Sequence, residues 1–208
     1  MQVVVPYTTR DPKSRLADVL SLAERRAFAR AMRDDVLDAV RAAGETPTLL
    51  TADESDADGA DAPAVVDDRP LTPAVNAVLE THAETESVAV VMADLALATP
   101  DALSRLFESE GDVVVAPGRG GGTNALVVRH PDFRVDYHGA SYRDHRRLAA
   151  AADLSVTDVD SMRLSTDVDE PSDLAEVLLH GTGAARDWLV DAGFELDVAD
   201  GRVGVTRE

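Results

Sequence analysis

The pattern of hydrophobic and polar positions predicts strands that alternate with helices along the chain. Short apolar runs, typical of buried strands, occupy residues 3–6, 48–51, 64–66, 88–92, 113–116 and 125–128. Apolar residues at helical spacing predict helices near residues 73–84, 100–109, 145–152, 172–180 and 184–191. This alternation indicates an α/β fold of three layers, in which helices flank both faces of a mainly parallel sheet.

The first long helix carries the clearest boundary signals. Ser21 and Glu24 form an S-x-x-E capping box, apolar residues then follow at helical spacing, and Gly44 marks the end. At the other end of the sequence, residues 194–198 and 202–205 flank Ala199-Asp200-Gly201, which is typical of a β-hairpin.

Residues 53–61 are acidic and contain Gly59, so we expect a solvated loop there. The 208 residues contain no internal repeat or long linker, which predicts a single domain over residues 1–208. No run is apolar over the roughly 18 residues that a membrane span needs, and residues 1–6 lack the basic flank of a signal peptide. We therefore expect a cytoplasmic protein without a membrane partner.

The charge balance argues against nucleic-acid binding and for work in concentrated salt. The sequence has 39 Asp plus Glu against 20 Lys plus Arg, a net charge of −19, and Lys13 is its only lysine. Such a surface repels polyanions, and molar salt shortens the screening length to about 3 Å. We hypothesise a halophilic protein, whose melting temperature should rise between low salt and molar KCl. A melting temperature that does not change would contradict this hypothesis.

Basic residues cluster in the loop after the first strand. Arg10, Lys13 and Arg15 lie together there, in a chain that otherwise avoids lysine. An ammonium beside guanidinium groups suits a triphosphate, although a single surface lysine can also arise by chance. In an open parallel sheet, ligands bind at the carboxyl ends of the strands, which is where this loop lies.

Acidic residues follow other strands of the predicted sheet. Asp94 comes directly after the apolar run 88–92, and Asp167 and Asp169 lie at i and i+2 of an extended segment, so that their side chains share a face. Together the three carboxylates offer the hard oxygen ligands that Mg²⁺ prefers. A solvated turn, or a cap that Asp169 provides for the next helix, is the alternative interpretation.

A glycine-rich segment, Pro117-Gly118-Arg119-Gly120-Gly121-Gly122-Thr123-Asn124, also follows an apolar run. Its backbone N–H groups could form an anion-binding concavity with the Thr123 hydroxyl, or the segment could be a flexible hairpin loop. It matches neither a P-loop nor G-x-G-x-x-G. Further along, His138, Gly139, Ser141 and His145 lie at a junction before a helix, where we interpret the histidines as packing or capping residues.

Taken together, five motifs resemble the 2-phospho-L-lactate guanylyltransferases (CofC) of archaea in order and in spacing. The motifs are Lys13-Ser14-Arg15-Leu16, Met92-Ala93-Asp94-Leu95, Gly120-Gly121-Gly122-Thr123-Asn124, His138-Gly139-Ala140-Ser141-Tyr142 and Thr166-Asp167-Val168-Asp169-Glu170-Pro171. Two positions depart from the family pattern: Thr8 stands where members often have a lysine, and Ala96 stands where they often have a proline.

The resemblance implies a nucleotide-diphospho-sugar transferase fold and a step in coenzyme F(420) biosynthesis. The reaction would join GMP from GTP to 2-phospho-L-lactate and release pyrophosphate; bacterial relatives use phosphoenolpyruvate. The resemblance also implies a homodimer and a downstream transferase that receives the guanylylated lactate. Two alternatives remain. The protein could be another nucleotidyltransferase, of the molybdopterin or sugar-phosphate type, or a non-catalytic GTP-binding regulatory subunit.

The same resemblance assigns roles to residues. Asp94, Asp167 and Asp169 align with the metal-binding carboxylates, which would hold Mg²⁺. The contacts to the acid substrate align with Thr123, Gly139 and Ser141, with Gly122 and Asn124 in the same loop. With Thr8 in place of a lysine, the triphosphate is left to Arg10, Lys13 and Arg15, of which Lys13 and Arg15 would act in catalysis.

Overall fold

A mainly parallel sheet forms the centre of the molecule, as expected. The computed structural model describes residues 1–82, 85–198, 201 and 203–207, and there the main sheet has the strand order β3-β2-β1-β4-β6-β5-β7. Its strands are β1 (Gln2–Tyr7), β2 (Pro47–Thr51), β3 (Ala64–Val66), β4 (Val88–Val91), β5 (Val113–Pro117), β6 (Thr123–Val128) and β7 (Val156–Asp158). β6 runs antiparallel to β4 and β5, and the other pairs are parallel.

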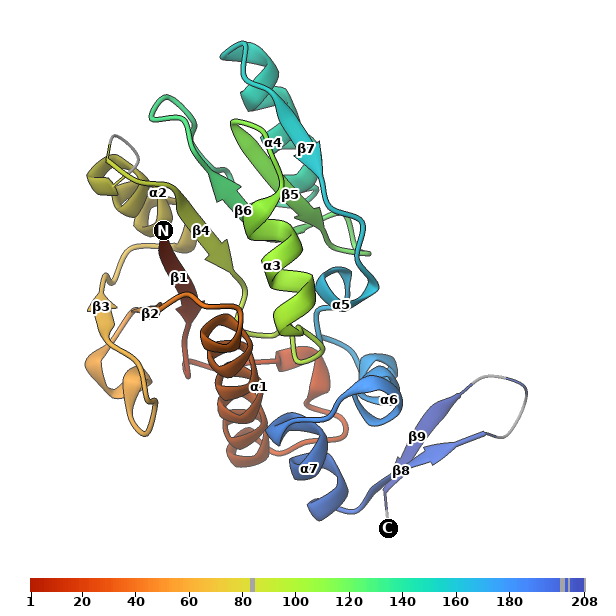
Figure 1. Ribbon diagram of the computed structural model, residues 1–208. Coiled ribbons are helices and arrows are strands. Elements are labelled where there is room, and N and C mark those ends of the chain that lie inside the picture. The colour runs from red at the N-terminus through yellow and green to blue at the C-terminus, as the bar shows by residue number, and fades with distance from the viewer. Residues whose placement is uncertain (83–84, 199–200, 202, 208) are drawn as a thin grey trace.

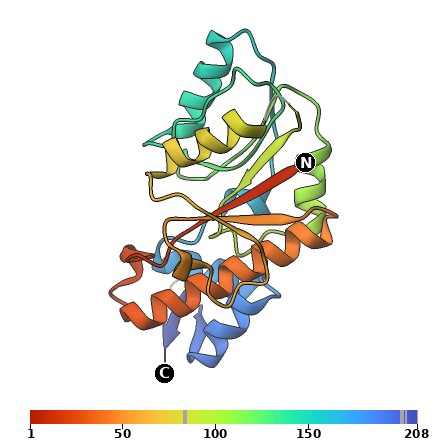
Figure 2. The same cartoon turned by 90° about the vertical axis from the view of Figure 1, so that its left-hand side faces the viewer.

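Helices cover both faces of this sheet (Figures 1 and 2). One face packs against α1 (Leu22–Ala42), α3 (Pro100–Glu108), α5 (Met162–Ser165), α6 (Pro171–His180) and α7 (Ala184–Asp191). The other face packs against α2 (Leu71–His82) and α4 (Ser141–Ala151). Two short 3₁₀ helices, η1 (Ser14–Leu16) and η2 (Glu54–Ala57), lie in loops. The three-layer architecture that the sequence predicts is therefore confirmed.

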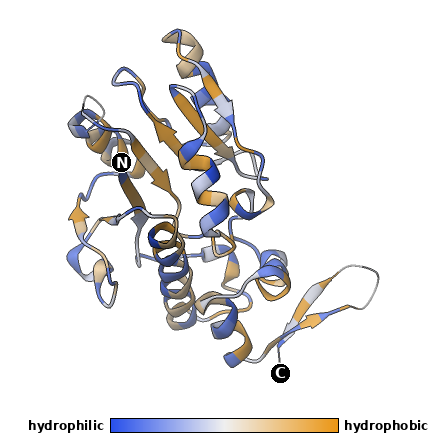
Figure 3. Cartoon of the chain, in the orientation of Figure 1, coloured by the Kyte–Doolittle hydropathy of each residue, from blue (hydrophilic) through white to orange (hydrophobic). Residues whose placement is uncertain are grey.

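The central strands are hydrophobic on both faces, which explains their nearly continuous valine sequences (Figure 3). In β1, Val3 and Val5 belong to the core below α1, whereas Val4 belongs to the core below α2 and α4. No helix in the described part of the chain has both the length and the apolar character of a membrane span.

The predicted capping box at the start of α1 is present. The Ser21 backbone N–H donates to Glu24 Oε2 at 2.8 Å, and the Glu24 N–H donates to Ser21 Oγ at 3.4 Å. The C-terminal hairpin is also present, with β8 (Phe194–Asp197) paired antiparallel to β9 (Gly204–Arg207). Its predicted turn residues Ala199 and Asp200 lie outside the described residues.

The solvated loop expected at residues 53–61 is partly wrong, because Asp56 is buried. The segment contains η2, and Asp56 is only 4% exposed. Its Oδ1 atom accepts hydrogen bonds from the N–H and the hydroxyl of Thr9, the N–H bond measuring 2.8 Å. Asp56 therefore fixes the loop that follows β1, and buried polar groups of this kind keep their hydrogen bonds.

Replacing Asp56 by alanine should destabilise the protein. The half-buried Thr9 N–H and hydroxyl would lose their acceptor, which costs roughly 1–3 kcal/mol. The free energy of unfolding, measured with urea in high salt, tests this expectation. Asp61→Ala is the matched control in the same acidic segment, because Asp61 is exposed, and it should change stability by less than about 0.5 kcal/mol. Equal effects of the two substitutions would contradict the structural role of Asp56.

Candidate active site

Lys13 lies between two carboxylates that are far away in the sequence. Its Nζ atom is 2.6 Å from Asp94 Oδ2 and 2.7 Å from Asp169 Oδ1. Asp94 follows β4, Asp169 precedes α6, and Lys13 belongs to the loop after β1. The carboxyl ends of β1 and β4 and the segment before α6 thus bring together three residues that the sequence predicts as site residues.

The backbone around Lys13 is held in an unusual conformation. Lys13 has φ 53° and ψ 47°, in the left-handed region that non-glycine residues seldom adopt. The preceding residues are anchored by Arg25 of α1, whose guanidinium donates to Asp11 Oδ1 at 2.8 Å and to the Pro12 carbonyl at 2.7 Å. A largely buried arginine therefore determines where the ammonium of Lys13 points.

The charge of Lys13 is stabilised by its partners. Burial alone would lower the pKa of Lys13, but the negative charges of Asp94 and Asp169 outweigh burial, and the pKa is raised above its ordinary value. The ammonium therefore stays protonated over the whole neutral range.

Asp167 completes a group of three carboxylates. Its Oδ1 atom accepts a hydrogen bond of 3.1 Å from the Asn124 side-chain amide. Burial raises the pKa of Asp167, and the negative charge of Asp94 raises it further. Asp94 pairs with Lys13 through Oδ2, and its buried Oδ1 atom has no hydrogen-bond partner among the described residues. A divalent cation would relieve the repulsion between these carboxylates, and the free oxygen of Asp94 is a possible ligand for it.

Asp169 is not the cap of the following helix. The N-cap of α6 is Glu170, and Asp173 accepts the backbone N–H groups of Asp169 and Glu170 at 3.0 and 2.8 Å. Asp173 also pairs with Arg119 of the glycine-rich segment at 3.0 Å. Asp173 therefore orients the acidic motif, a role that the sequence analysis missed.

The glycine-rich segment is a tight connection between β5 and β6. The Gly118 N–H donates to the Gly122 carbonyl at 2.9 Å, and Gly121 adopts φ 86°. A side chain at Gly118 would collide with the Asn124 amide, which also donates to the Leu164 carbonyl at 3.0 Å. The segment thus holds Asn124 against Asp167, and it forms a β-turn connection rather than a loose loop.

Thr123 and Ser141 lie side by side at the start of β6 and of α4. The Thr123 backbone N–H donates to Ser141 Oγ at 2.9 Å, and both residues are 4% exposed. Gly139, just before α4, has φ 47°, so the turn that presents Ser141 suits glycine. Two of the predicted acid-binding residues are therefore in contact.

His145 packs beneath this pair, as the sequence analysis expected. It is 1% exposed, its Nδ1 atom is 2.9 Å from Thr123 Oγ1, and its Nε2 atom is 2.9 Å from the Asp136 backbone nitrogen. Burial lowers the pKa of His145 to about 4. His138, by contrast, is exposed and pairs with Asp136.

Two adjoining cavities open beside Lys13 and Asp94. A cavity of 220 Å³ is lined by Thr8, Lys13, Met92 and Asp94. A second cavity of 490 Å³ shares Thr8 and Met92 with the first and extends over the ends of β2 and β3 to the start of α2. We call the second one the β2–β3 pocket. Its lining residues Asp68 and Arg69 follow the apolar run 64–66, a strand-end signal that the sequence analysis did not use.

The two predicted arginines occupy different places. Arg15 lies at the rim of the carboxylate group, exposed, with its guanidinium 3.9 Å from Asp169 and 3.7 Å from Glu170. Arg10 lines the β2–β3 pocket instead. Lys13 and Arg15 therefore share Asp169 as a partner, whereas Arg10 lies at the β2–β3 pocket.

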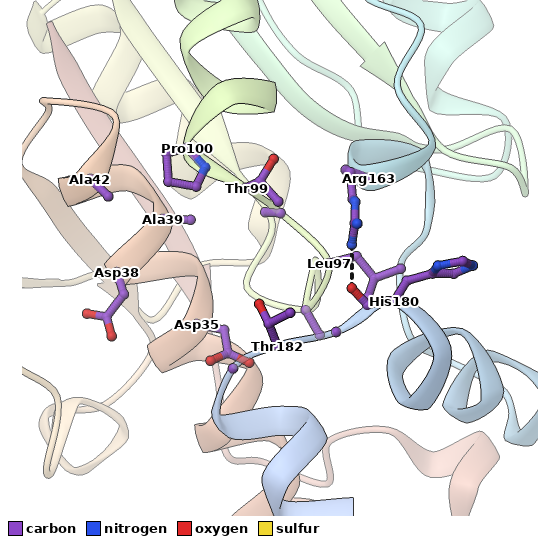
Figure 4. A pocket seen from close by; sticks show the side chains of 14 residues that line it. Asp35, Asp38, Ala39, Ala42, Leu97, Thr99, Pro100, Arg163, His180 and Thr182 are labelled. Atoms are coloured by element: carbon purple, nitrogen blue, oxygen red, sulfur yellow. Dashed lines mark hydrogen bonds between the residues drawn. The ribbon is translucent and has the colours of Figure 1, made fainter. Parts of the chain in front are cut away.

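A further cavity, of 270 Å³, contains none of the predicted site residues (Figure 4). It lies between α1, the loop before α3 and residues 180–183, and Arg163, which also lines it, donates to the His180 carbonyl at 2.5 Å. Asp35 at its edge accepts the N–H groups of Ala184 and Ala185 at 2.6 and 2.9 Å, which caps α7. A side chain at Gly183 would collide with Asp35, so this cavity belongs to the attachment of α7.

Comparison with known proteins shows that the chain is a nucleotidyltransferase. A family model described as "Guanylyl transferase CofC like" matches residues 1–207. The chain therefore belongs to the CofC-like guanylyl transferase family.

Curated relatives agree with the family match. The chain is 65% identical over 207 residues to a 2-phospho-L-lactate guanylyltransferase of Halomicrobium mukohataei, covering 100% of both chains. It is 62% identical over 214 residues to the protein of that name from Haloferax volcanii, covering 100% of this chain and 99% of the relative.

Solved structures agree with the fold. A Desulfovibrio desulfuricans G20 protein assigned as a nucleotide-diphospho-sugar transferase superposes with a TM-score of 0.74 at 16% identity, covering 92% of this chain and 95% of that one. A Mycobacterium tuberculosis protein solved in complex with manganese has a TM-score of 0.52 at 18% identity, covering 86% and 97%. The nucleotide-diphospho-sugar transferase-like fold is thereby confirmed.

Proposed function

We propose that the protein transfers GMP from GTP to 2-phospho-L-lactate and releases pyrophosphate, in the biosynthesis of coenzyme F(420). The observation that carries the proposal is the contact of Lys13 with Asp94 and Asp169 beside two open pockets. It occurs in a chain that is 65% identical to a relative named 2-phospho-L-lactate guanylyltransferase. An ammonium held among carboxylates at a pocket is suited to neutralising a polyphosphate.

The nucleoside part of GTP is assigned to the β2–β3 pocket. Its volume of 490 Å³ and its apolar lining by Leu50, Leu71 and Ala74 suit a flat base and a ribose. The triphosphate would then extend past Thr8 toward Lys13, with Arg10 on the nucleoside side and Arg15 at the rim. Arg10, Lys13 and Arg15 together neutralise its charge in this proposal.

The reaction needs little proton transfer from the protein. The phosphate of the acid substrate has a second pKa of about 6, so at neutral pH its oxygen can attack the α-phosphorus directly. One P–O bond forms there, and the bond to the β-phosphate breaks and releases pyrophosphate. Lys13 and Arg15 stabilise the negative charge on the leaving group, and catalysis consists of alignment and charge neutralisation.

The carboxylates Asp94, Asp167 and Asp169 are assigned to Mg²⁺. No three acidic or histidine side chains in the described residues already converge on one metal position. Lys13 separates Asp94 from Asp169, while the unpartnered Asp94 Oδ1 and the raised pKa of Asp167 support a cation there. When bound, the ion would offset the repulsion between the nucleotide and the acid phosphate.

The acid substrate is assigned to a wall formed by the starts of β6 and α4. Thr123 and Ser141 supply hydroxyl donors, and Gly122 and Gly139 allow the backbone to approach an anion closely. Asn124, at the start of β6, connects this wall to Asp167. These five residues form the acid-binding wall in this proposal.

Pyrophosphate release in molar KCl tests the function. Purified protein with GTP, Mg²⁺ and 2-phospho-L-lactate should release pyrophosphate, and each other nucleoside triphosphate should give less. Faster release with phosphoenolpyruvate would reassign the acid substrate, and release only with a sugar phosphate or a molybdopterin would reassign the transferase. GTP binding without turnover on any acid would indicate a regulatory subunit and contradict the proposal.

We also expect a cytoplasmic homodimer that passes its product to a second transferase. The product contains a reactive phosphoanhydride, so a downstream enzyme that accepts the guanylylated lactate is chemically reasonable. Sedimentation velocity in molar KCl measures the oligomeric state, and a single monomeric species would contradict the homodimer.

A further inference from the structure

His145 accepts a hydrogen bond on one ring nitrogen, which determines the hydrogen position on the other. The Asp136 backbone N–H can only donate, so the Nε2 atom that it contacts at 2.9 Å must be the acceptor. In a neutral imidazole the hydrogen then resides on Nδ1. His145 therefore donates from Nδ1 to Thr123 Oγ1, which lies 2.9 Å away.

The surroundings keep the ring neutral. Burial is the largest influence and lowers the pKa of His145 to about 4, even though the charges of Asp136 and Asp144 favour protonation and His138 disfavours it. The Phe133 and Tyr137 rings pack edge-on against the imidazole, at centroid distances of 6.1 and 5.1 Å. The tautomer is consequently the same throughout the neutral range.

A fixed donor on His145 occupies one lone pair of Thr123 Oγ1, so the hydroxyl hydrogen of Thr123 must point away from the imidazole. Thr123 Oγ1 accepts from His145, and no acceptor for the Thr123 hydroxyl hydrogen exists among the described residues. The Ser141 hydroxyl is arranged similarly. Its Oγ atom accepts from the Thr123 N–H, and its hydroxyl hydrogen has no acceptor among the residues that the structure describes. Two adjacent hydroxyl groups thus have free hydrogens, which is the arrangement that an anion requires.

We propose that His145 is a positioning residue for substrate recognition: through its Nδ1–H it orients the Thr123 hydroxyl hydrogen toward the anionic group of the phosphorylated acid. The proposal rests on the assignment of the acid substrate to Thr123 and Ser141. It predicts that His145 affects binding of the acid and leaves binding of the nucleotide unchanged, since Lys13 and the β2–β3 pocket do not contact it.

Two substitutions separate this role from simple packing. The amide nitrogen of Asn can occupy the position of Nδ1, so His145→Asn keeps a donor to Thr123. The amide oxygen of Gln can occupy the position of Nε2, so His145→Gln keeps the acceptor for Asp136 and loses the donor. Both substitutions remove the ring, so a packing role predicts similar losses for the two.

Steady-state pyrophosphate release by the two variants gives the first measurement. We expect the KM for the acid to rise roughly tenfold to a hundredfold in His145→Gln. The Thr123 hydroxyl would then no longer be held toward the anionic group of the acid, and a hydrogen bond to a charged group contributes about this much. It should rise less than about threefold in His145→Asn, and the KM for GTP should stay constant in both. Equal rises in the two variants, or a parallel rise in the KM for GTP, would overturn the proposal.

A double-mutant cycle gives the second measurement. Thr123→Val removes the hydroxyl that His145 orients, so adding His145→Gln to it should raise the KM for the acid little further. Multiplying effects would show that the two residues act independently and would overturn the proposal.

A spectroscopic measurement separates this proposal from the proposed function. In ¹⁵N-labelled wild-type protein, the His145 imidazole should carry its hydrogen on Nδ1 from pH 5.5 to 8, and the signal, assigned by its loss in His145→Gln, should not titrate there. A hydrogen on Nε2 would overturn the positioning role even in an active enzyme. If wild-type protein turns over no acid while this tautomer is observed, the proposed function fails.

Discussion

Asp94→Asn should reduce pyrophosphate release at least about 100-fold, because it removes a negative charge that pairs with Lys13 and that we assign to binding Mg²⁺. Asp94 Oδ2 pairs with Lys13 at 2.6 Å, while Oδ1 is buried and free for a cation. Asparagine has nearly the same shape but neither pairs with an ammonium as strongly nor coordinates Mg²⁺ as well. The loss should appear in kcat and in the Mg²⁺ concentration that gives half-maximal turnover.

The matched control for Asp94→Asn is Asp158→Asn. Asp158 also ends a strand of the sheet and also pairs with a cation, Arg146 at 2.5 Å. Its strand, β7, is separated from β4 and Asp94 by β6 and β5. Its substitution should leave turnover within about twofold, since exposed ion pairs contribute little. If Asp94→Asn keeps most of its Mg²⁺-dependent turnover, the metal assignment is wrong.

The positions of the site residues could be predicted because strand ends are recognisable in the sequence. Lys13, Asp94 and Asp169 all follow apolar runs or motifs at one edge of the predicted sheet, and in the structure each carboxylate lies within 2.7 Å of Lys13 Nζ. The direct pairing of Lys13 with the two carboxylates could not be predicted. It depends on the left-handed backbone at Lys13 and on Arg25, which anchors the preceding residues from α1.

Other features escaped prediction for physical reasons. β7 has three residues and α5 has four, which is too short for a periodic pattern of apolar positions to develop. Asp56 is an acidic residue in an acidic segment, and its burial depends on tertiary contacts with Thr9, 47 positions away, and with Arg33. His145 was expected to pack, and it does, but its hydrogen bonds to Thr123 and Asp136 depend on the tertiary structure.

Lys13→Met should lower kcat by roughly 10²–10³-fold, the loss typical of removing one group that stabilises developing charge. Lys13 is the only lysine of the chain, and its neighbours Arg10 and Arg15 cannot replace it: Arg10 lines the β2–β3 pocket and Arg15 is 3.9 Å from Asp169 at the rim. Lys13→Arg should recover little activity, because a planar guanidinium does not fit between two carboxylates arranged around a point charge. Arg105→Met, on the exposed side of α3, is the control and should be active.

The same substitution should change stability in a way that depends on Mg²⁺. Without Lys13, the negative charges of Asp94, Asp167 and Asp169 repel one another, and the exposed Arg15 guanidinium near Asp169 offsets them weakly. We expect a loss of roughly 1–3 kcal/mol, less than for a fully buried pair because the side chains of Asp94 and Asp169 are 26% and 39% exposed. A divalent cation can replace the lost ammonium, so Mg²⁺ should raise the melting temperature of Lys13→Met more than that of the wild type. An equal Mg²⁺ effect on both proteins would mean that Lys13 and the metal do not share these carboxylates, and the cation would then have to be placed elsewhere.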